Sequence, residues 1–134
     1  MGSRNVERLK RGNAAFNRGD FDGLTAAFAA DAELVDRANA PDQPTVVSGR
    51  DAIREVARQW ARQFDPLRCD IEEFIEVGDA VICASRWHGR GRASRVPTDI
   101  RQFDVYQFRD HEVIRATLGC RSQEEARKAA EVEE

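Results

Sequence analysis

Apolar side chains recur at helical spacing twice before residue 30. Val6, Leu9, Asn13 and Phe16 mark one face of a helix that the pattern predicts over residues 3–17. A polar cluster interrupts this pattern, and helical spacing then returns over residues 20–29. The N-terminal third of the chain is therefore predicted to hold two consecutive helices, the second beginning with an aspartate placed to cap its free N–H groups.

The next segment changes period and then returns to a helix. A short strand is predicted at residues 33–36, a proline-containing loop at 37–44 that is placed to form a rim or lid over a pocket, and a second short strand at 45–47. Apolar residues then follow the strongest helical pattern in the chain, ended by Asp65-Pro66. The residues of this third helical stripe are Ile53, Val56, Ala57, Trp60 and Phe64.

From residue 67 onward the period is two, which is typical of β-strands. Four strands are predicted, at 67–77, 80–89 continuing toward 95, 98–109 and 112–119. The compact pairs Gly78-Asp79 and Asp110-His111 are suited to hairpin turns, so successive strands form an antiparallel meander. A final helix is predicted from Ser122, where Ser122 and Glu125 have the spacing of a capping box.

Helices followed by a meander predict an α+β fold, in which a long, strongly curved antiparallel sheet wraps around three main helices. At 134 residues the chain fits a single domain over 1–134, with a core at about 5–120 and a C-terminal helix and tail at 121–134. A curved sheet of this kind encloses a conical core that is open at one end, so the architecture favours a pocket.

Composition and charge indicate which partners, cellular location and cofactors to expect. The formal net charge is −3, and no apolar run approaches the length of a membrane helix, so neither nucleic acid nor a membrane is expected as a partner. The N-terminus has no signal-peptide pattern, and three widely spaced cysteines suit a reducing compartment, so a cytoplasmic location is expected. The two histidines have no metal-ligand spacing, and no phosphate or dinucleotide fingerprint occurs, so neither a metal nor a cofactor is expected.

Asp104 is the most unusual residue of the meander, because aspartate is a poor strand former. Period two places it on one face with Ile100, Gln102, Tyr106 and Phe108. If such a carboxyl is excluded from solvent among these groups, its pKa is raised and it can exchange a proton near neutral pH. The alternative is an exposed aspartate, or one paired with Arg101 or Arg86.

Arg86, Trp87 and His88 form a second candidate cluster on the preceding strand. Alternation leaves two possibilities: either Arg86 and His88 point into the cone and bind a ligand, or Trp87 packs there. Phe16 and Trp60, on apolar helix faces, are candidates for the wall of a pocket.

Six short stretches of the chain form a recognisable set: AFNRGDFDGL at 15–24, FAADAE at 28–33, GRDAIR at 49–54, VGDAV at 77–81, VYQFRD at 105–110 and VIR at 113–115. Together they resemble the SnoaL-like branch of the nuclear transport factor 2-like superfamily, which includes polyketide cyclases and ketosteroid isomerases. The resemblance covers roughly residues 5–127. It implies a cone-shaped roll, a hydrophobic small-molecule ligand and often a homodimer packed through the sheet.

The resemblance also implies roles for particular residues. The general base of ketosteroid isomerases corresponds to Asp36, and the late-strand acid corresponds to Asp104, whereas the tyrosine of that family falls near Gly12. The tyrosine donor is thus absent there, although Tyr106, on the face of Asp104, is a candidate to replace it. The implied chemistry is proton transfer next to a carbonyl without a cofactor.

Three classes of function remain open at this point. The first is a SnoaL-like isomerase or cyclase acting on a hydrophobic carbonyl compound, which requires Asp36 and Asp104 to face one cavity. The second is a non-catalytic binder of a similar ligand, with one carboxyl turned away or paired. The third is a dimeric scaffold whose cone is filled by its own side chains.

Overall fold

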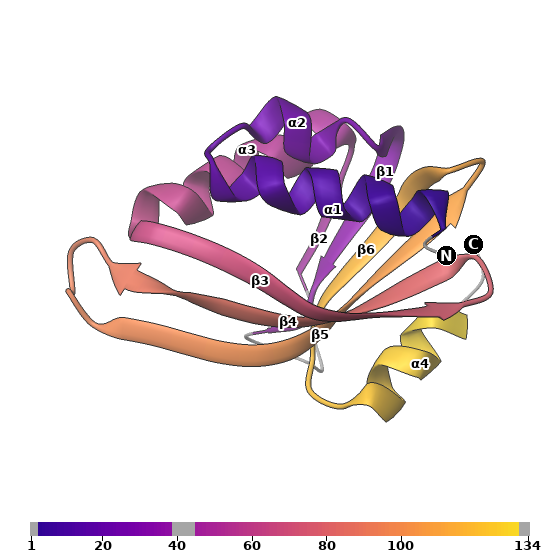
Figure 1. Ribbon diagram of the computed structural model, residues 1–134. Coiled ribbons are helices and arrows are strands. Elements are labelled where there is room, and N and C mark those ends of the chain that lie inside the picture. Colours follow the sequence, from indigo (N-terminus) through magenta and orange to yellow (C-terminus); the bar gives the residue numbers. More distant parts are fainter. Residues whose placement is uncertain (1–2, 39–44, 132–134) are drawn as a thin grey trace.

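The computed structural model describes residues 3–38 and 45–131 and contains four helices and six strands in that part of the chain (Figure 1). In chain order these are α1 (Arg4–Asn17), α2 (Phe21–Thr25), β1 (Phe28–Asp36), β2 (Thr45–Ser48), α3 (Arg50–Gln63), β3 (Phe64–Val77), β4 (Ala80–Gly91), β5 (Pro97–Arg109), β6 (Glu112–Cys120) and α4 (Gln123–Glu131).

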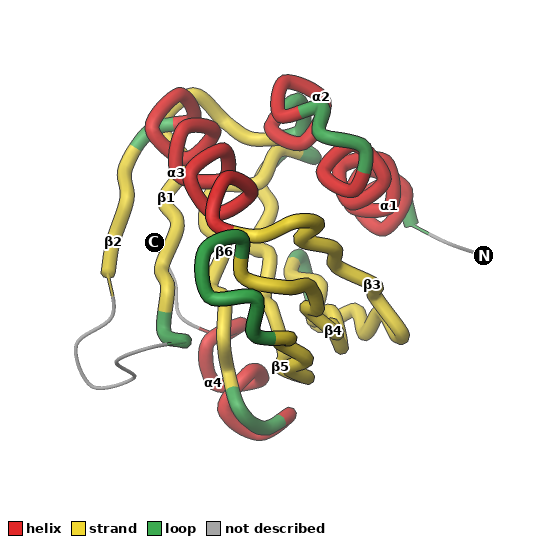
Figure 2. The backbone as a smooth tube through the Cα atoms, turned by 90° about the vertical axis from the view of Figure 1, so that its left-hand side faces the viewer, coloured by secondary structure: helices red, strands yellow, loops and turns green. Residues whose placement is uncertain are grey.

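The six strands form one curved sheet in the order β2-β1-β6-β5-β4-β3. All neighbours are antiparallel except β1 and β6, which run parallel. Helices α1, α2 and α3 cover the inner face of the curve, and α4 packs on the outer face (Figures 1 and 2). The predicted α+β roll around three helices is therefore confirmed, as is the antiparallel meander of β3 to β6.

Local sequence signals explain several element ends. The Asp20 carboxylate accepts a hydrogen bond from the Gly23 N–H at 2.9 Å and caps α2 as expected. The Ser122 hydroxyl accepts from the Glu125 N–H at 3.1 Å at the start of α4. At the β5–β6 turn, Asp110 and His111 have positive φ, the conformation that a tight hairpin turn requires.

The main error of the sequence prediction concerns the second helix. Helical spacing predicted residues 20–29, but α2 ends at Thr25 and β1 already begins at Phe28. The Val113 N–H donates to the Ala27 carbonyl at 2.8 Å, and Phe28 is paired with Val113. Pairing with β6 thus overrides the local helical pattern, because tertiary contacts outweigh weak propensities. Of the predicted loop, residues 39–44 lie outside the described part of the chain.

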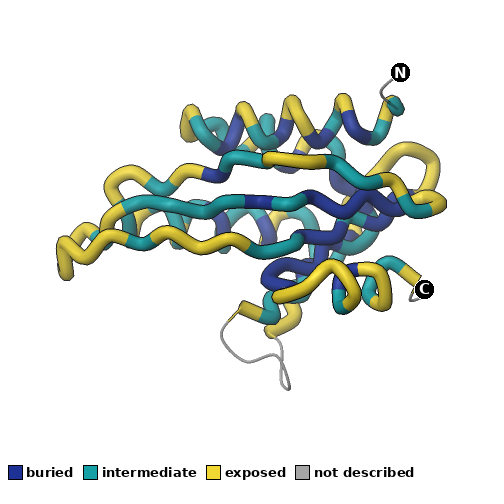
Figure 3. Tube along the Cα trace, turned by 60° about the horizontal axis from the view of Figure 1, so that its bottom comes forward, coloured by how far each residue is buried: buried dark blue, intermediate teal, exposed yellow. Residues whose placement is uncertain are grey.

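Two apolar layers use opposite faces of the same strands. On the inner face, Val81 and Cys83 pack with α1 and α3, whereas Ile82 and Val105 pack against α4 on the outer face. Buried residues gather in the half of the sheet that α4 covers, and exposed ones at the β4–β5 end (Figure 3). None of the helices in the described ranges is long and apolar enough to cross a membrane.

Asn17 fixes α1 over the free edge of the sheet. Its side-chain oxygen accepts from the Cys69 N–H at 2.9 Å, and its side-chain nitrogen donates to the Cys69 carbonyl at 2.8 Å. The amide therefore pairs with edge strand β3 as a neighbouring strand would. This contact holds the space between α1 and the sheet at a defined width.

Candidate functional site

An apolar cavity of about 70 Å³ lies between α1, α3 and the inner face of the sheet. Aromatic and branched aliphatic side chains form most of its wall. They are Leu9, Phe16, Leu24, Phe28, Leu34, Ile53, Trp60, Ile71, Trp87 and Leu118. The side chains therefore do not fill the cone completely, whereas the scaffold hypothesis required a filled cone.

Phe16 and Trp60 line this cavity, as the sequence predicted. Phe16 lies edge-on to Trp87, with ring centroids 5.4 Å apart. Such edge-to-face pairs are favourable because the positive edge of one ring meets the negative face of the other. The pair forms a rigid aromatic corner of the wall.

Three polar side chains also line the cavity: Arg8 and Asn13 from α1, and Tyr106 from β5. Within residues 3–38 and 45–131, none of the three makes a hydrogen bond or an ion pair. Sequence reasoning missed Arg8 as a site residue. It placed Asn13 on the apolar stripe of the first helix, and a polar residue on such a stripe is the signal that would have identified it.

Tyr106 combines burial with a free hydroxyl. Burial raises the pKa of this hydroxyl well above its ordinary value, and the negative charge of nearby Asp104 raises it further. The hydroxyl therefore keeps its proton and can donate a hydrogen bond to an acceptor in the cavity. The family resemblance made Tyr106 a candidate for the hydrogen-bond donor that is absent near Gly12, and this role stays a prediction.

Asp104 lies on the inner face of β5, directly behind the cavity wall, and is only 1% exposed. One carboxylate oxygen, Oδ2, accepts from the Trp87 indole N–H at 2.9 Å. The other, Oδ1, accepts from the Gln102 amide at 2.8 Å and from the Gly119 backbone N–H at 3.0 Å. Asp104 is thus buried as predicted, and not paired with Arg101 or Arg86.

Two opposing effects act on the pKa of Asp104. Burial raises it because desolvation penalises the charged form, and hydrogen bonds from Trp87, Gly119, Gln102 and Ser85 offset part of this rise. Because N–H donors occupy both oxygens, and Asp104 is not among the cavity-lining residues, its visible role is to hold the Trp87 ring in the wall.

Asp36 lies at the end of β1, on the same sheet face as the cavity. It pairs in register with Leu118, and Leu34, two residues earlier, also lines the cavity. The Asp36 carboxylate accepts from the Ala38 N–H at 3.0 Å, which is a turn-forming contact. Asp36 therefore lies at the end of the strand pair that contributes Leu34 and Leu118 to the wall, and neither Asp36 nor Asp104 is among the residues that line the cavity.

The structure decides between the two alternatives for the Arg86–Trp87–His88 cluster. Trp87 lines the cavity, so Arg86 and His88 point to the opposite, outer face. There Arg86 binds Asp99 through two contacts of 2.8 Å, and His88 Nε2 lies 2.7 Å from Asp70. The expectation that Arg86 and His88 line the pocket is wrong, because the pleat places neighbouring residues on opposite faces.

The cysteines provide no reactive group at the cavity. Cys69 lines it, but burial, the nearby Asp104 charge and further contacts leave the pKa of its thiol far above the ordinary value. Thiolate chemistry is thereby suppressed. Among the residues that the structure describes, no cluster of three or more histidine, cysteine, aspartate or glutamate side chains is arranged to hold a metal ion.

Comparison with solved structures shows the same fold. An NTF2-like protein of unknown function from Burkholderia pseudomallei superposes with a TM-score of 0.76 at 19% identity, covering 87% of this chain and 89% of that chain. A putative SnoaL-like polyketide cyclase from Jannaschia sp. gives 0.74 at 18% identity, covering 85% and 83%. A putative isomerase from Bacillus subtilis gives 0.73 at 18% identity, covering 85% and 84%.

Comparison at the level of sequence assigns the family. A search of curated proteins found no match. The sequence profile of the SnoaL-like domain matches residues 9–116, which is most of the chain and includes the greater part of α1, of the cavity wall and of the sheet. The chain belongs to the SnoaL-like domain family.

Proposed function

We propose that this protein binds a small, mostly apolar molecule carrying a carbonyl or similar oxygen acceptor, and that Tyr106 donates a hydrogen bond to that oxygen. The observation that supports the proposal most directly is the Tyr106 side chain, which lines an apolar cavity without a hydrogen-bond partner in the described ranges. Binding is favoured over other functions because the cavity is formed while neither predicted catalytic carboxyl lines it.

The energetic argument concerns the unpaired hydroxyl. A ligand that fills the cavity withdraws this hydroxyl from water, and a polar group withdrawn without a partner costs roughly 1–3 kcal/mol. A ligand oxygen in the cavity would remove this cost, whereas a purely hydrocarbon ligand would not. The site therefore favours an oxygen-bearing ligand over its hydrocarbon analogue.

The cavity volume limits the ligand. An engineered protein cavity that binds benzene measures about 150 Å³. The cavity here measures about 70 Å³, so it encloses a slim molecule, or one end of a longer molecule, and not a fused ring system.

A second candidate is cofactor-independent proton transfer on the same ligand, favoured by the position of Asp36. Its Oδ2 accepts no hydrogen bond from the residues described, and Asp36 shares the sheet face of Leu34 and Leu118 at the end of the cavity. In this scheme Asp36 takes a proton from the carbon next to the carbonyl. The C–H electron pair then forms the enolate, whose oxygen receives the Tyr106 hydrogen bond.

Binding is tested with 2-hexanone and its hydrocarbon isostere 2-methyl-1-hexene, followed through the methyl NMR signals of Leu9, Leu34 and Leu118. Tyr106→Phe is expected to weaken ketone binding about threefold to tenfold, since it removes one hydrogen bond, and to leave the isostere unaffected. If neither compound moves these methyl signals in the wild-type protein, the binding proposal is wrong.

Proton transfer is tested separately by following deuterium incorporation into 2-hexanone in heavy water. The catalytic scheme predicts protein-dependent exchange that Asp36→Asn abolishes while ketone binding persists. Exchange that is unchanged in Asp36→Asn would rule out this residue as the base and leave the binding proposal intact.

A further inference from the structure

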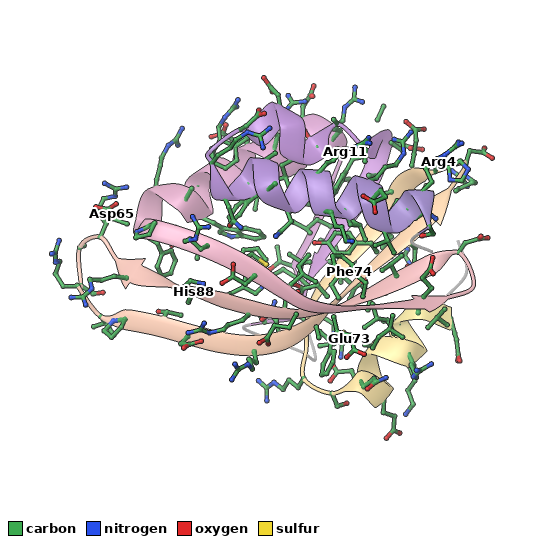
Figure 4. The ribbon with its side chains drawn as sticks, viewed as in Figure 1. Arg4, Arg11, Asp65, Glu73, Phe74 and His88 are labelled. Atoms are coloured by element: carbon green, nitrogen blue, oxygen red, sulfur yellow. The ribbon has the colours of Figure 1, made fainter. Side chains whose placement is uncertain are left out.

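A second concavity lies beside the cavity, between α1 and the edge strand β3. This α1–β3 groove has a volume of about 560 Å³ and includes Lys10, Asn13, Asn17, Arg68, Ile71 and Phe74 in its walls. Figure 4 shows Phe74 below α1, on β3. The Asn17–Cys69 hydrogen bonds hold the helix at a fixed distance from the strand, and they therefore fix the two walls of the groove relative to each other.

The groove adjoins the apolar cavity. Asn13 and Ile71 line both spaces, so these two side chains form the boundary between them. The Asn13 amide makes no hydrogen bond within the described part of the chain. The cavity and the groove are therefore adjacent at Asn13, and the groove offers space that the cavity itself lacks.

The groove and the cavity differ in charge. Lys10, Arg18 and Arg68 line the groove, and none of the acidic residues that the structure describes does. Arg18 is paired with Asp20 at 3.1 Å, Lys10 makes a longer ion pair with Glu7 at 3.8 Å, and Arg68 makes no ion pair with any described residue. The groove is therefore suited to an anion, and the cavity to an apolar group.

The Lys10 ammonium has a defined position. It lies over the Phe74 ring, 5.6 Å from the ring centroid, and both residues line the groove. A cation held over an aromatic face keeps its direction, because the ring quadrupole attracts it. Lys10 thus combines a position in the groove with a contact to an aromatic residue of its wall.

We infer that the ligand is an oxo carboxylate, with its apolar, carbonyl-bearing end in the cavity and its carboxylate in the α1–β3 groove near Lys10 and Arg68. This inference rests on the proposed function, since it assumes that the cavity is a binding site. It adds an anionic head group, a second subsite and the course of the chain past Asn13. The Asn13 amide lies where it can hydrogen-bond the linking segment.

The test compares oxo acids with their neutral primary amides, using 4-oxopentanoate, 5-oxohexanoate and 6-oxoheptanoate to cover the unknown spacing. Binding is followed through the cavity methyl signals of Leu9 and Leu34. At least one acid is expected to bind about threefold to tenfold more tightly than its amide. Raising the salt concentration should reduce this preference, because the groove is open to solvent.

Substitutions locate the carboxylate. The double variant Lys10→Gln with Arg68→Gln is expected to abolish the preference for the acid while leaving the affinity for the amide unchanged. Arg11→Gln is the matched control, since Arg11 is an exposed arginine next to Lys10 in α1 that lines neither space (Figure 4). The control should retain the full preference.

The outcomes separate the two proposals. If acids and amides move the cavity methyl signals but bind equally well, the anionic subsite is wrong and the cavity proposal stands. If Arg8→Gln removes the preference and the double variant does not, the carboxylate lies at Arg8 and the groove assignment is wrong. If no acid or amide moves the methyl signals, the cavity proposal itself fails.

Discussion

Replacing Asp104 by asparagine tests whether this carboxylate organises the cavity wall. The substitution keeps the size of the side chain and exchanges one acceptor oxygen for an amide donor. If the asparagine oxygen takes the Oδ1 position, it keeps the hydrogen bonds from Gln102 and Gly119. The new NH₂ group then faces the Trp87 indole N–H, and two donors meet where a 2.9 Å hydrogen bond existed.

The size of the stability loss in Asp104→Asn can be worked out from these hydrogen bonds. Hydrogen bonds to a charged acceptor contribute roughly 1.5–3 kcal/mol, and a buried donor left without a partner costs roughly 1–3 kcal/mol. Relief from burying a charge offsets part of the loss. We therefore expect Asp104→Asn to lower the free energy of unfolding by about 2–4 kcal/mol.

The contribution of Asp104 to the free energy of unfolding changes with pH in a defined direction. Burial raises the pKa of Asp104 in the folded state above its unfolded value near 3.8, so the folded protein holds this proton more tightly. The stability that this provides is complete below the unfolded pKa and is lost as the pH rises through the folded pKa. The difference in unfolding free energy between wild type and Asp104→Asn should therefore be larger at acidic pH than at neutral pH.

Urea unfolding followed by far-UV circular dichroism gives the required free energies. A double-mutant cycle with Trp87→Phe is expected to show a coupling energy of about 1–2 kcal/mol between the two residues. The control Asp70→Asn, which affects a half-exposed contact with His88 on the outer face, should cost less than about 1 kcal/mol. A coupling near zero, or an effect of Asp104→Asn no larger than that of the control, would refute the reasoning.

Three further predictions follow from other contacts. Asn17→Ala should lower the free energy of unfolding by about 1–3 kcal/mol in urea, because it removes both hydrogen bonds to edge residue Cys69; an unchanged midpoint would contradict this. The three buried thiols, with pKa values raised by burial (that of Cys120 to about 11), should react with dithionitrobenzoate only when the protein is unfolded; rapid reaction of the native protein would show that they are accessible. Arg86→Gln should leave the affinity for 2-hexanone within about twofold of wild type in the same NMR titration, because Arg86 faces away from the cavity; a larger loss would place it in the site.

The strands and the third helix could be predicted closely from the sequence because their patterns are local. Period-two alternation and compact turn residues gave β3 to β6 within a few residues at each end. The limit of α2 could not be predicted in this way. It depends on the pairing of Phe28 with Val113, which lies far away in the sequence, and helical spacing carries no information about that partner.

In the candidate site too, local sequence patterns could be interpreted, whereas contacts between distant segments could not be predicted. Asp104 could be identified because a carboxylate inside a strand demands an explanation, but its donors Trp87 and Gly119 come from other strands and have no signature near it. Alternation showed that Trp87 and Arg86 face opposite sides without showing which side is inside. Only the packing of α1 and α3 on one face decides that question.

The central claim is that Tyr106 donates a hydrogen bond to a ligand oxygen inside the cavity. The most direct measurement is the ¹³C chemical shift of the carbonyl carbon of bound 2-hexanone, labelled at that carbon, in the wild-type protein and in Tyr106→Phe. The account predicts a downfield shift in the wild type that disappears in the variant, because a donated hydrogen bond polarises the carbonyl. The same carbonyl shift in both proteins would contradict it.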